Sequence, residues 1–513
     1  MNKLKINKLN PDNIILNNEY SVNDKNTWCA LVQVYQDFSK ESTVHGIKYT
    51  TQAKTTVEKF LWLTVVVISL VASSELANKF YKRHESANMR TTVVSNQFPS
   101  LRIAIPAFTI CQGYLVSAER LEALTNGKTP LKIPADARAS DLERGVAHLR
   151  EIVHPEGERR AIPELERLQR ILDANGMSLA GLLEAVSPRC GDLLAGCVYE
   201  GRLEACERLF VPTVTSHGIC CSFNNAAQKR SSLSQRKGSE AATSGKDRYS
   251  INFGSQYIMS VLLKSSKVED RLASFAYNTG YKILIHERHT LPGPNSLDFV
   301  VASGHETIVS LQGTLLTSSP EVLDLPTHQR ECRKSQRSSS IYRSENCYMR
   351  CRDRAIRRSC GCVPFYANDA ESIRDSCNLT HVPCLARIVS NVNSMPLRNP
   401  GCDCLPDCES TRYTASITGQ PLEAAKFKPG RFFELAQKIP NSTALHLTFA
   451  DQTATLERRE LVLSWINLVS SLGGVFSLFL GCSFISVIEF FYFFFYQLIL
   501  KLKFKNTRND IQK

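Results

Sequence analysis

The chain has 513 residues, 18 cysteines and a formal net charge of +13 at pH 7. This length allows several domains. The positive charge is compatible with nucleic-acid binding, but the sequence has neither zinc-finger spacing nor a basic face interleaved with aromatic residues. The two ends also carry part of the excess charge. Nucleic acid is therefore not an expected partner.

The cysteines are concentrated in one block of the chain. Sixteen of them lie between Cys111 and Cys408, and only Cys29 and Cys482 fall outside it. An even number of cysteines within one block is typical of a disulfide framework in an oxidising compartment.

Residues 1–59 form a polar N-terminal segment. The first thirty residues lack the apolar core and cleavage site of a signal peptide, so we expect no cleaved signal. A His45-Gly46 pair lies shortly before the first apolar stretch. Such a pair, taken alone, is more often a turn than a functional site.

The first apolar stretch, FLWLTVVVISLVASS, carries no charge from Phe60 to Ser74. Fifteen residues are short for a membrane span, but Lys59 can extend its ammonium to the interface and the helix can continue into LANKFY. We predict a transmembrane helix over 60–81. A buried core helix is the alternative, and the cysteine block and the second apolar stretch argue against it.

The region 82–460 shows both strand and helix patterns. IAIPAFTIC, which contains Cys111, alternates and is rich in β-branched residues, as strands are. Residues 139–210 have helical periodicity, with a capping box predicted from Ser140 and Glu143 and a helix cap from Ser178. His286 and His289 could bind metal, but two lone histidines are more often structural, and we expect no metal site.

The later cysteines fall into close pairs. Cys347 and Cys351 share one face of a predicted helix capped by Ser344, and CGC and CDC motifs follow at 360–362 and 402–404. A zinc site is the competing interpretation, but it needs a reducing compartment or closure by four ligands.

The second apolar stretch, Leu461 to Leu500, contains one charged residue, Glu489. A span takes roughly 20 residues, and one continuous helix of this length would reach about 60 Å, so it must break, tilt or leave the bilayer. Small residues crowd its middle, including Gly473, Gly474, Gly481 and Ser483. They suit either a pore lining or an ordinary anchor helix with small packing residues. We predict the second transmembrane segment over 461–496.

Two spans place both chain ends on one side of the membrane. The lysine-rich tail, residues 497–513, favours the cytoplasm, whereas Lys79, Lys82 and Arg83 oppose a strict charge count. Together with the cysteines, this predicts a multi-pass plasma-membrane protein with cytoplasmic termini and an extracellular 82–460 region. The glycosylation sequons at Asn378 and Asn441 lie in that region.

The string GGVFSLFLGCSFISVIEFFYF resembles the second transmembrane segment of the epithelial sodium channel/degenerin family. LFVPTVTSHGICCSFN is close to the signature of its arthropod pickpocket branch. The resemblance implies a selectivity filter at Gly481, Cys482 and Ser483. It implies a pore lined by Gly473, Gly474, Ser477 and Glu489, with gating residues Ser470, His45 and Gly46. One departure is Ser471, where the family often has an aspartate.

The family resemblance also implies a disulfide pairing. The pairs are Cys111–Cys220, Cys197–Cys206, Cys332–Cys408, Cys347–Cys404, Cys351–Cys402, Cys360–Cys384 and Cys362–Cys377. Two cysteines of the block are then left, Cys190 and Cys221, and we expect them to pair with each other.

The expected fold is that of an α+β membrane protein in which two transmembrane helices flank a large, disulfide-rich extracellular domain with a β-strand core and peripheral helices. By resemblance, its function is a subunit of a gated, sodium-preferring, amiloride-sensitive cation channel. Sodium ions, the lipid bilayer and related subunits in a homo- or hetero-trimer are its expected partners, and no cofactor is expected.

Two other classes of membrane protein would have a similar topology. Another two-span trimeric channel, gated by extracellular ATP, shares the topology, but its phosphate-binding lysine pattern is missing. A membrane-anchored receptor or ectoenzyme would suit the topology as well. The chain has no GxSxG, HExxH, P-loop or paired catalytic signature, so we do not expect an enzyme.

Overall fold

The computed structural model describes residue 28 and residues 31–86, 88–126, 131–156, 161–227, 247–293, 296–335, 341–367, 375–393, 398–399, 402–423, 426 and 430–501. The chain divides into two compact units. The membrane unit comprises Met1–Arg90 and Leu461–Lys513, and the disulfide unit comprises Thr91–Glu460.

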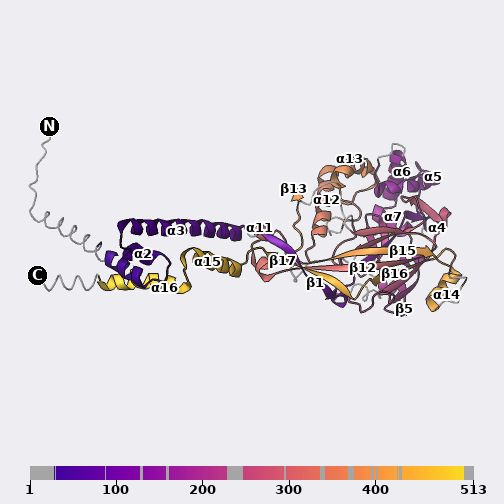
Figure 1. Cartoon of the computed structure of the whole chain (residues 1–513). Helices are drawn as coiled ribbons and strands as arrows, with labels where there is room; N and C mark the ends of the chain where they lie inside the picture. Colours follow the sequence, from indigo (N-terminus) through magenta and orange to yellow (C-terminus); the bar gives the residue numbers. More distant parts are fainter. Residues whose placement is uncertain are drawn as a thin grey trace, which may run out of the picture. The chain divides into compact units, whose positions relative to one another are not determined.

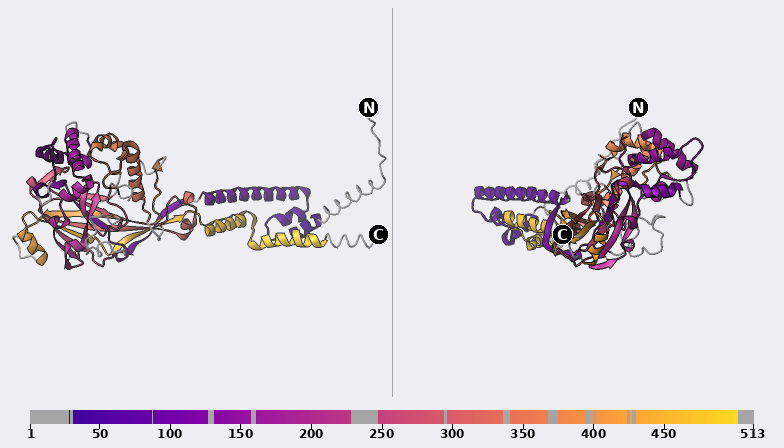
Figure 2. Two further views of the ribbon diagram at one scale, coloured as in Figure 1. Left: turned by 180° about the vertical axis from the view of Figure 1, so that it is seen from behind. Right: turned by 90° about the vertical axis from the view of Figure 1, so that its right-hand side faces the viewer.

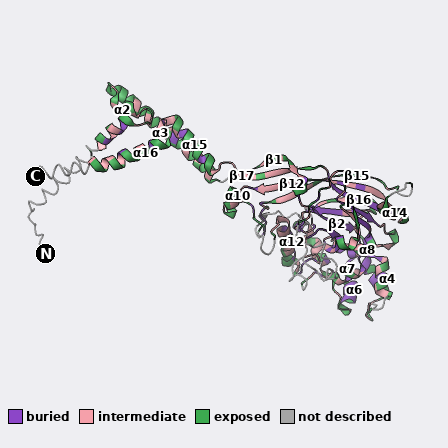
Figure 3. Ribbon diagram, turned by 90° about the horizontal axis from the view of Figure 1, so that it is seen from below, coloured by how far each residue is buried: buried purple, intermediate pink, exposed green. Residues whose placement is uncertain are grey.

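The first long helix of the membrane unit, α3, runs over Thr56–Glu85. It exceeds the predicted 60–81 span at both ends. At its start the Thr55 hydroxyl accepts the Glu58 N–H, and the Glu58 carboxylate accepts the Thr55 N–H in return, so a capping box begins the helix before the apolar run. Its apolar side chains are largely exposed within the chain (Figure 3), as expected of a helix that faces lipid.

The second apolar stretch is two helices rather than one. β17, Thr453–Leu461, takes its first residue, and α15 then runs over Trp465–Leu480 and α16 over Phe484–Phe491. A π-helical turn, Tyr492–Gln497, continues α16 as an apolar helix that extends to Lys501. α3 and the 484–501 helix are both long and apolar enough to cross a membrane. The predicted 461–496 segment is therefore interrupted near its middle.

A short helix, α2 (Ile47–Gln52), packs beside α3 within the membrane unit (Figure 1). The ring of Tyr49 stacks on Trp62 of α3, with centroids 4.7 Å apart. Phe38, which precedes α2, is buried against Phe493 and Phe494 of the last helix. The N-terminal segment thus contacts both membrane helices.

The disulfide unit is built on two main β-sheets. The larger sheet has the strand order β1–β17–β12–β16–β8–β4–β5, with β15 also paired to β12. Its other strands are β1 (Met89–Pro99), β12 (His305–Ser318), β16 (Thr443–Phe449), β8 (Met259–Leu263), β4 (Leu194–Tyr199), β5 (Arg202–Glu204) and β15 (Ser410–Pro421). β12 is parallel to β16 and β17 and antiparallel to β15, so its fourteen residues connect three neighbours.

The smaller sheet has the order β11–β10–β2–β7–β6. Its strands are β11 (Leu297–Val301), β10 (Tyr281–His286), β2 (Ala107–Gln112), β7 (Gly218–Phe223) and β6 (Phe210–Thr215). β2 is the strand predicted around Cys111. Phe108, Phe210 and Phe223 from three of these strands meet as a fully buried aromatic cluster at the centre of the main core.

A second core is helical. It is formed by α4 (Ala118–Asn126), α5 (Ala139–Ala147), the short 3-10 helix Leu149–Ile152, α6 (Ala161–Ala174) and α7 (Leu179–Val186). The predicted cap at Ser178 is confirmed, since its hydroxyl accepts the Gly181 N–H. The capping box predicted at Ser140 is wrong: Ser140 lies inside α5, and the Asp141 carboxylate instead accepts the Arg138 N–H at 2.7 Å. An aspartate at the third helical position closes the turn as well as the predicted glutamate would.

The third helical element is the pair α12 (Ser344–Cys360) and α13 (Val382–Asn393). Figures 1 and 2 show the pair beside α5–α7. Ser344 is the first residue of α12 rather than its predicted cap. Its hydroxyl donates to Asp407 at 2.8 Å, so it holds the helix end to a separate loop.

Eight disulfides lie in the disulfide unit. They are Cys111–Cys220, Cys190–Cys221, Cys197–Cys206, Cys332–Cys408, Cys347–Cys404, Cys351–Cys402, Cys360–Cys384 and Cys362–Cys377. These pairs coincide with those implied by the family resemblance and with the proposed Cys190–Cys221 pair. Because Cys347 and Cys351 lie one turn apart on α12, they bond Cys404 and Cys402 in reverse order, like the rungs of a ladder.

Candidate functional site

The break between α15 and α16 falls at Gly481, Cys482 and Ser483, the three residues that the resemblance assigns to the filter. Gly481 has a φ of +62°, which ends α15 in the left-handed conformation that favours glycine. The Ser483 hydroxyl accepts the Ser486 N–H at 3.3 Å, and the Ser486 hydroxyl accepts the Ser483 N–H at 3.0 Å. This reciprocal cap restarts the helix.

The break leaves backbone carbonyl groups without partners. Among the described residues, none donates a hydrogen bond to the carbonyl oxygens of Gly481 and Cys482. Unpaired backbone at membrane depth is costly unless it is buried in protein or faces water or an ion. These carbonyls can therefore serve as ligands for a cation.

The N-terminal segment Ser42–Gly46 binds the α15 side of this break. The His45 N–H donates to the Leu480 carbonyl at 2.8 Å. The His45 ring also occupies the space that a side chain on Gly481 would need, with ring atoms 2.5 to 2.7 Å from the ideal Cβ position. Gly481 is thus required both by its φ and by the close approach of His45.

The same segment binds the α16 side through Thr43. The Thr43 N–H and hydroxyl both donate to Glu489 Oε2, at 3.1 and 3.0 Å, and its hydroxyl lies 2.6 Å from that of Ser486. Gly46, with a φ of +85°, then turns the chain into α2. We call residues Ser42–Gly46 the clamp segment. It brings together the predicted residues His45, Gly46, Gly481 and Glu489, together with Thr43, which was not predicted.

The remaining predicted pore residues lie on α15. Ser470, Gly473, Gly474 and Ser477 are all exposed within the chain, and no atom lies within 4 Å of a Cβ built on either glycine. Their spacing places them on one face of the helix. Leu468 and Val475, which are buried, lie on the opposite face, and α15 packs beside α3. The small-residue face is thus left uncovered by the other described residues of this chain.

Cys482 is a free thiol at an intermediate level of exposure. Cys29 lies outside the described residues. Of the two sequon asparagines, Asn441 is exposed in a turn with a φ of +53°. Asn378 is partly buried, and its Oδ1 accepts the Thr380 hydroxyl at 2.7 Å.

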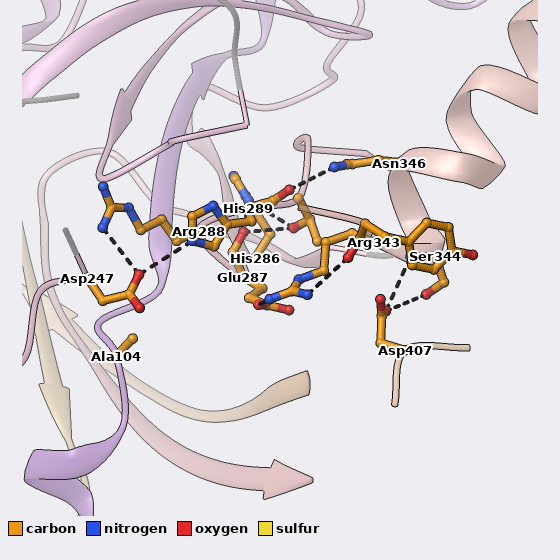
Figure 4. Close-up of polar contacts among 12 residues, drawn as sticks. Ala104, Asp247, His286, Glu287, Arg288, His289, Arg343, Ser344, Asn346 and Asp407 are labelled. Atoms are coloured by element: carbon orange, nitrogen blue, oxygen red, sulfur yellow. Dashed lines mark hydrogen bonds and ion pairs between the residues drawn. The ribbon is translucent and has the colours of Figure 1, made fainter. Parts of the chain in front are cut away.

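A polar cluster in the disulfide unit was not predicted as a group (Figure 4). Arg343 pairs with Glu287, and Asp247 lies 3.3 Å from Arg288 and 3.4 Å from His289. Asn346 bridges the Leu291 N–H and the His289 carbonyl, at 2.8 and 2.7 Å. These contacts tie the turn after β10 to the start of α12.

Carboxyl groups in this cluster lie in a poorly solvated environment. Burial raises the pKa of Glu345 to about 7, with Asp407 adding to the shift and the Thr290 hydrogen bond and Arg343 opposing it. Burial also raises the pKa of Asp407. His286 takes part as a buried structural residue, since its ring contacts Thr109 Oγ1 and the Glu287 carbonyl. Sequence periodicity carried no signal for this cluster, because its members come from four separate segments of the chain.

Comparison with known proteins places these features in context. Residues 38–493 match the family described as Amiloride-sensitive sodium channel. Sodium channel protein Nach of Drosophila melanogaster is 27% identical over 488 residues, which cover 93% of this chain and 89% of that protein. Pickpocket protein 28 of the same species is 23% identical, covering 92% of this chain and 80% of that protein. Bile acid-sensitive ion channel of Rattus norvegicus is 23% identical, covering 91% and 90%.

Proposed function

Since the chain belongs to the amiloride-sensitive sodium channel family, of which the epithelial sodium channels and degenerins are members, it is a subunit of a cation channel, and we propose that this channel prefers sodium and is blocked by amiloride. Its most similar relatives include Nach and pickpocket proteins, so it lies in the arthropod pickpocket branch. Like other members of its family it is a multimeric membrane protein and not an enzyme.

The observation that carries the proposal is the helix break at Gly481–Ser483. The carbonyl groups of Gly481 and Cys482, which accept no hydrogen bond from the described residues, can replace part of the hydration shell of a cation if several copies of the segment meet at one axis. One chain supplies one such segment, so a closed ring of copies is required. We propose a trimer, homomeric or formed with related subunits.

The clamp segment gives the filter a support. Its backbone holds the end of α15 through His45, and its Thr43 side chain holds α16 through Glu489. We propose that His45 and Gly46 act in gating through this position. A ring of Glu489 carboxylates would attract cations and repel anions, and part of each carboxylate is engaged by Thr43.

The small-residue face of α15 suits close packing near a symmetry axis. Ser470, Gly473, Gly474 and Ser477 would there face their counterparts in neighbouring subunits. We assign Ser470 to the gate and the other three residues to the pore lining.

The proposed orientation places the chain in the plasma membrane with both termini in the cytoplasm. Eight disulfides in the disulfide unit support an oxidising, extracellular location for it. We propose that Asn378 and Asn441 are glycosylated there. Glycosidase treatment of cell-surface protein should increase its electrophoretic mobility, and substitution of both asparagines should abolish that change.

Whole-cell recording tests the proposed function. Cells expressing the chain, challenged with acid, stretch or peptides, should carry an inward current that follows sodium when external ions are exchanged and that amiloride reduces. A surface-expressed chain whose current followed chloride would contradict the proposal.

A matched pair of substitutions tests the filter assignment. Ser483→Thr retains the hydroxyl that caps α16 but adds a methyl group at the break, so it should change the sodium-to-potassium permeability ratio. Ser464→Thr makes the same change at the cap of α15, where the Ser464 hydroxyl accepts the Asn467 N–H, and should leave that ratio unchanged. Equal ratios in both variants would argue against a filter at Ser483.

A further inference from the structure

The disulfide unit contains a cavity of about 450 Å³ with no role in the proposed ion pathway. It lies between the α12–α13 pair, the turn between β6 and β7, the end of the short 3-10 helix and strand β10. Its volume is within the range of small-molecule sites in proteins. We call it the α13 cavity.

One wall of the α13 cavity is apolar. Val382, Leu385, Val389 and Val392 line it from α13, at spacings that place them on one face of the helix. Ile356 of α12 and Phe365 extend this wall. A ligand with an apolar body would remove this surface from water, with a gain of about 25 cal/mol per Å².

A second part of the lining, which we call the basic wall, carries cationic groups. Lys282 of β10 and Arg352 of α12 both line the cavity, and Asp298 is the single carboxylate among its described lining residues. Asp298 pairs with Lys282 at 2.8 Å and is itself about half exposed, whereas the Lys282 side chain is mostly covered. One ammonium has three N–H donors, so the ion pair leaves capacity for a second acceptor.

Two histidines stand beside Lys282. The rings of His154 and His217 both contact Phe275, with centroids 5.7 and 6.1 Å apart, and both line the cavity. His217 Nδ1 is buried and has no hydrogen-bond partner among the described residues. Burial and, to a smaller extent, the nearby Lys282 together lower the pKa of His217 to about 4. These neutral rings can donate one hydrogen bond each without adding a competing charge.

The cavity therefore joins an apolar wall on α13 to a basic wall in which two histidine rings lie beside Lys282. Charges in a poorly solvated site favour a counter-ion that also satisfies their hydrogen bonds. From this arrangement we propose that the α13 cavity binds a small organic anion with an apolar body, its anionic group at Lys282 and His217 and its apolar part against α13.

Binding by the purified full-length chain in lipid nanodiscs tests this site without reference to any current. Three probes share one phenylbutyl carbon skeleton and differ in the terminal group, which is anionic, neutral or cationic: 4-phenylbutyrate, 4-phenylbutanol and 4-phenylbutylamine. Saturation-transfer NMR titrations, with empty nanodiscs as the blank, give the affinity of each. We expect the acid to bind about tenfold or more tightly than the amine at pH 7.5, since only the acid complements the basic wall.

Two substitutions localise the binding. Lys282→Met keeps most of the side-chain volume but leaves Asp298 without its cation. The variant should therefore bind the acid about tenfold more weakly, and the difference in affinity between acid and amine should shrink or reverse. Lys438→Met, on the exposed side of α14 (Arg431–Lys438), is the matched control and should change neither affinity.

A third substitution distinguishes binding in the α13 cavity from binding to lipid or to the protein surface. Val389→Trp fills the space beside α13 and should abolish saturable binding of the acid, with the thermal unfolding temperature recorded to verify folding. Equal affinities for the acid and the amine in the wild-type chain would overturn the proposal. So would acid binding that survives Lys282→Met unchanged, or no saturable acid binding at millimolar concentration.

Discussion

The two units of this protein are stabilised in opposite ways. The disulfide unit contains eight disulfides and two large apolar cores. In the described part of the membrane unit, the helix break at Gly481–Ser483 is held by hydrogen bonds from the clamp segment and by the approach of His45, and Cys482 is a free thiol.

This difference has consequences for what each unit can do. A disulfide typically contributes about 2–4 kcal/mol, whereas one hydrogen bond contributes about 0.5–1.5 kcal/mol net. Small changes of free energy therefore suffice to rearrange the clamp segment but not the disulfide-bonded parts of the chain. A rigid unit with the proposed ligand cavity and a less rigid unit with the proposed filter would suit a gated channel, because a conformational equilibrium of a few kcal/mol must remain within reach of a stimulus.

The largest effect is expected from removing one disulfide of the disulfide unit. Cys332→Ala with Cys408→Ala removes the bridge between residues 76 positions apart. We expect a loss of about 2–5 kcal/mol of stability and a severe loss of surface protein, measured by surface biotinylation. Cys482→Ala is the matched control and should reach the surface normally. Normal surface levels of the double variant would show that the Cys332–Cys408 bridge is not required to keep this unit folded.

A smaller but more specific effect is expected at Ser470. This residue lies on the small-residue face of α15, exposed within its own chain. If that face packs against neighbouring subunits when the channel is closed, Ser470→Val introduces strain of about 1–3 kcal/mol in the closed state alone. About 1.4 kcal/mol changes the closed-to-open ratio tenfold, so we expect a standing, amiloride-sensitive inward current.

Ser470→Ala separates size from hydroxyl chemistry. Alanine remains small, so this variant should stay closed at rest. A Ser470→Val channel that is silent at rest, although present at the surface and openable in its wild-type form, would place the gate elsewhere.

The sequence predicted the elements whose signals are local. The apolar stretches, the strand around Cys111 and the cap at Ser178 follow from composition, alternation and a single side chain. Motif resemblance supplied seven of the cysteine pairs, and the eighth, Cys190–Cys221, was proposed from the two cysteines that were left. It also supplied the location of the break, because glycine at Gly481 and serine at Ser483 are the residues that end and restart a helix.

What the sequence did not predict depends on contacts between distant segments. Thr43 meets Glu489 across 446 positions of the chain, and no periodicity links them. Ser140 and Ser344 were chosen as caps because serine favours that position. In the folded chain Asp141 supplies the first cap, and Asp407 binds the Ser344 hydroxyl. The α13 cavity likewise draws its walls from at least five segments.

A pH-dependent effect is expected at Glu345 in the disulfide unit. Its pKa of about 7 exceeds the ordinary value of 4.5, so the folded chain holds this proton more tightly than the unfolded chain. Between pH 4.5 and 7 the folded state therefore binds more protons, and the contribution of Glu345 to stability falls as the pH rises through this window.

Glu345→Gln mimics the protonated side chain and should remove this contribution. The free energy of unfolding of the variant minus that of wild type should be about 1–2 kcal/mol larger at pH 8 than at pH 5. This range allows for the partial exposure of the Glu345 side chain. Thermal unfolding of the detergent-solubilised full chain between pH 5 and 8 measures this difference. Glu434→Gln, on the exposed side of α14, should show no such trend, and a difference with the opposite sign would refute the assignment.

The smallest effect is expected within the clamp segment. It tests whether the hydrogen bonds of the membrane unit bias its conformational equilibrium. Thr43→Val removes the hydroxyl that donates to Glu489 at 3.0 Å but keeps the backbone N–H contact at 3.1 Å. Glu489→Gln removes the charge and should also lower cation conductance if Glu489 faces the pore. Each variant should shift the closed–open equilibrium, measured as open probability in single-channel records.

The two clamp changes should not be additive. If the side chains act through their mutual contact, the double variant should fall short of the sum of the single variants by about 0.5–1.5 kcal/mol, up to about tenfold in the equilibrium constant. Thr64→Val is the control for Thr43→Val, because the Thr64 hydroxyl donates to the Phe60 carbonyl within α3. Its effect should add independently to that of Glu489→Gln. Additivity of Thr43 and Glu489 would mean that the clamp contact does not bias the gate. The support of the filter would then rest on the His45 bond to Leu480 and on the packing of His45 against Gly481.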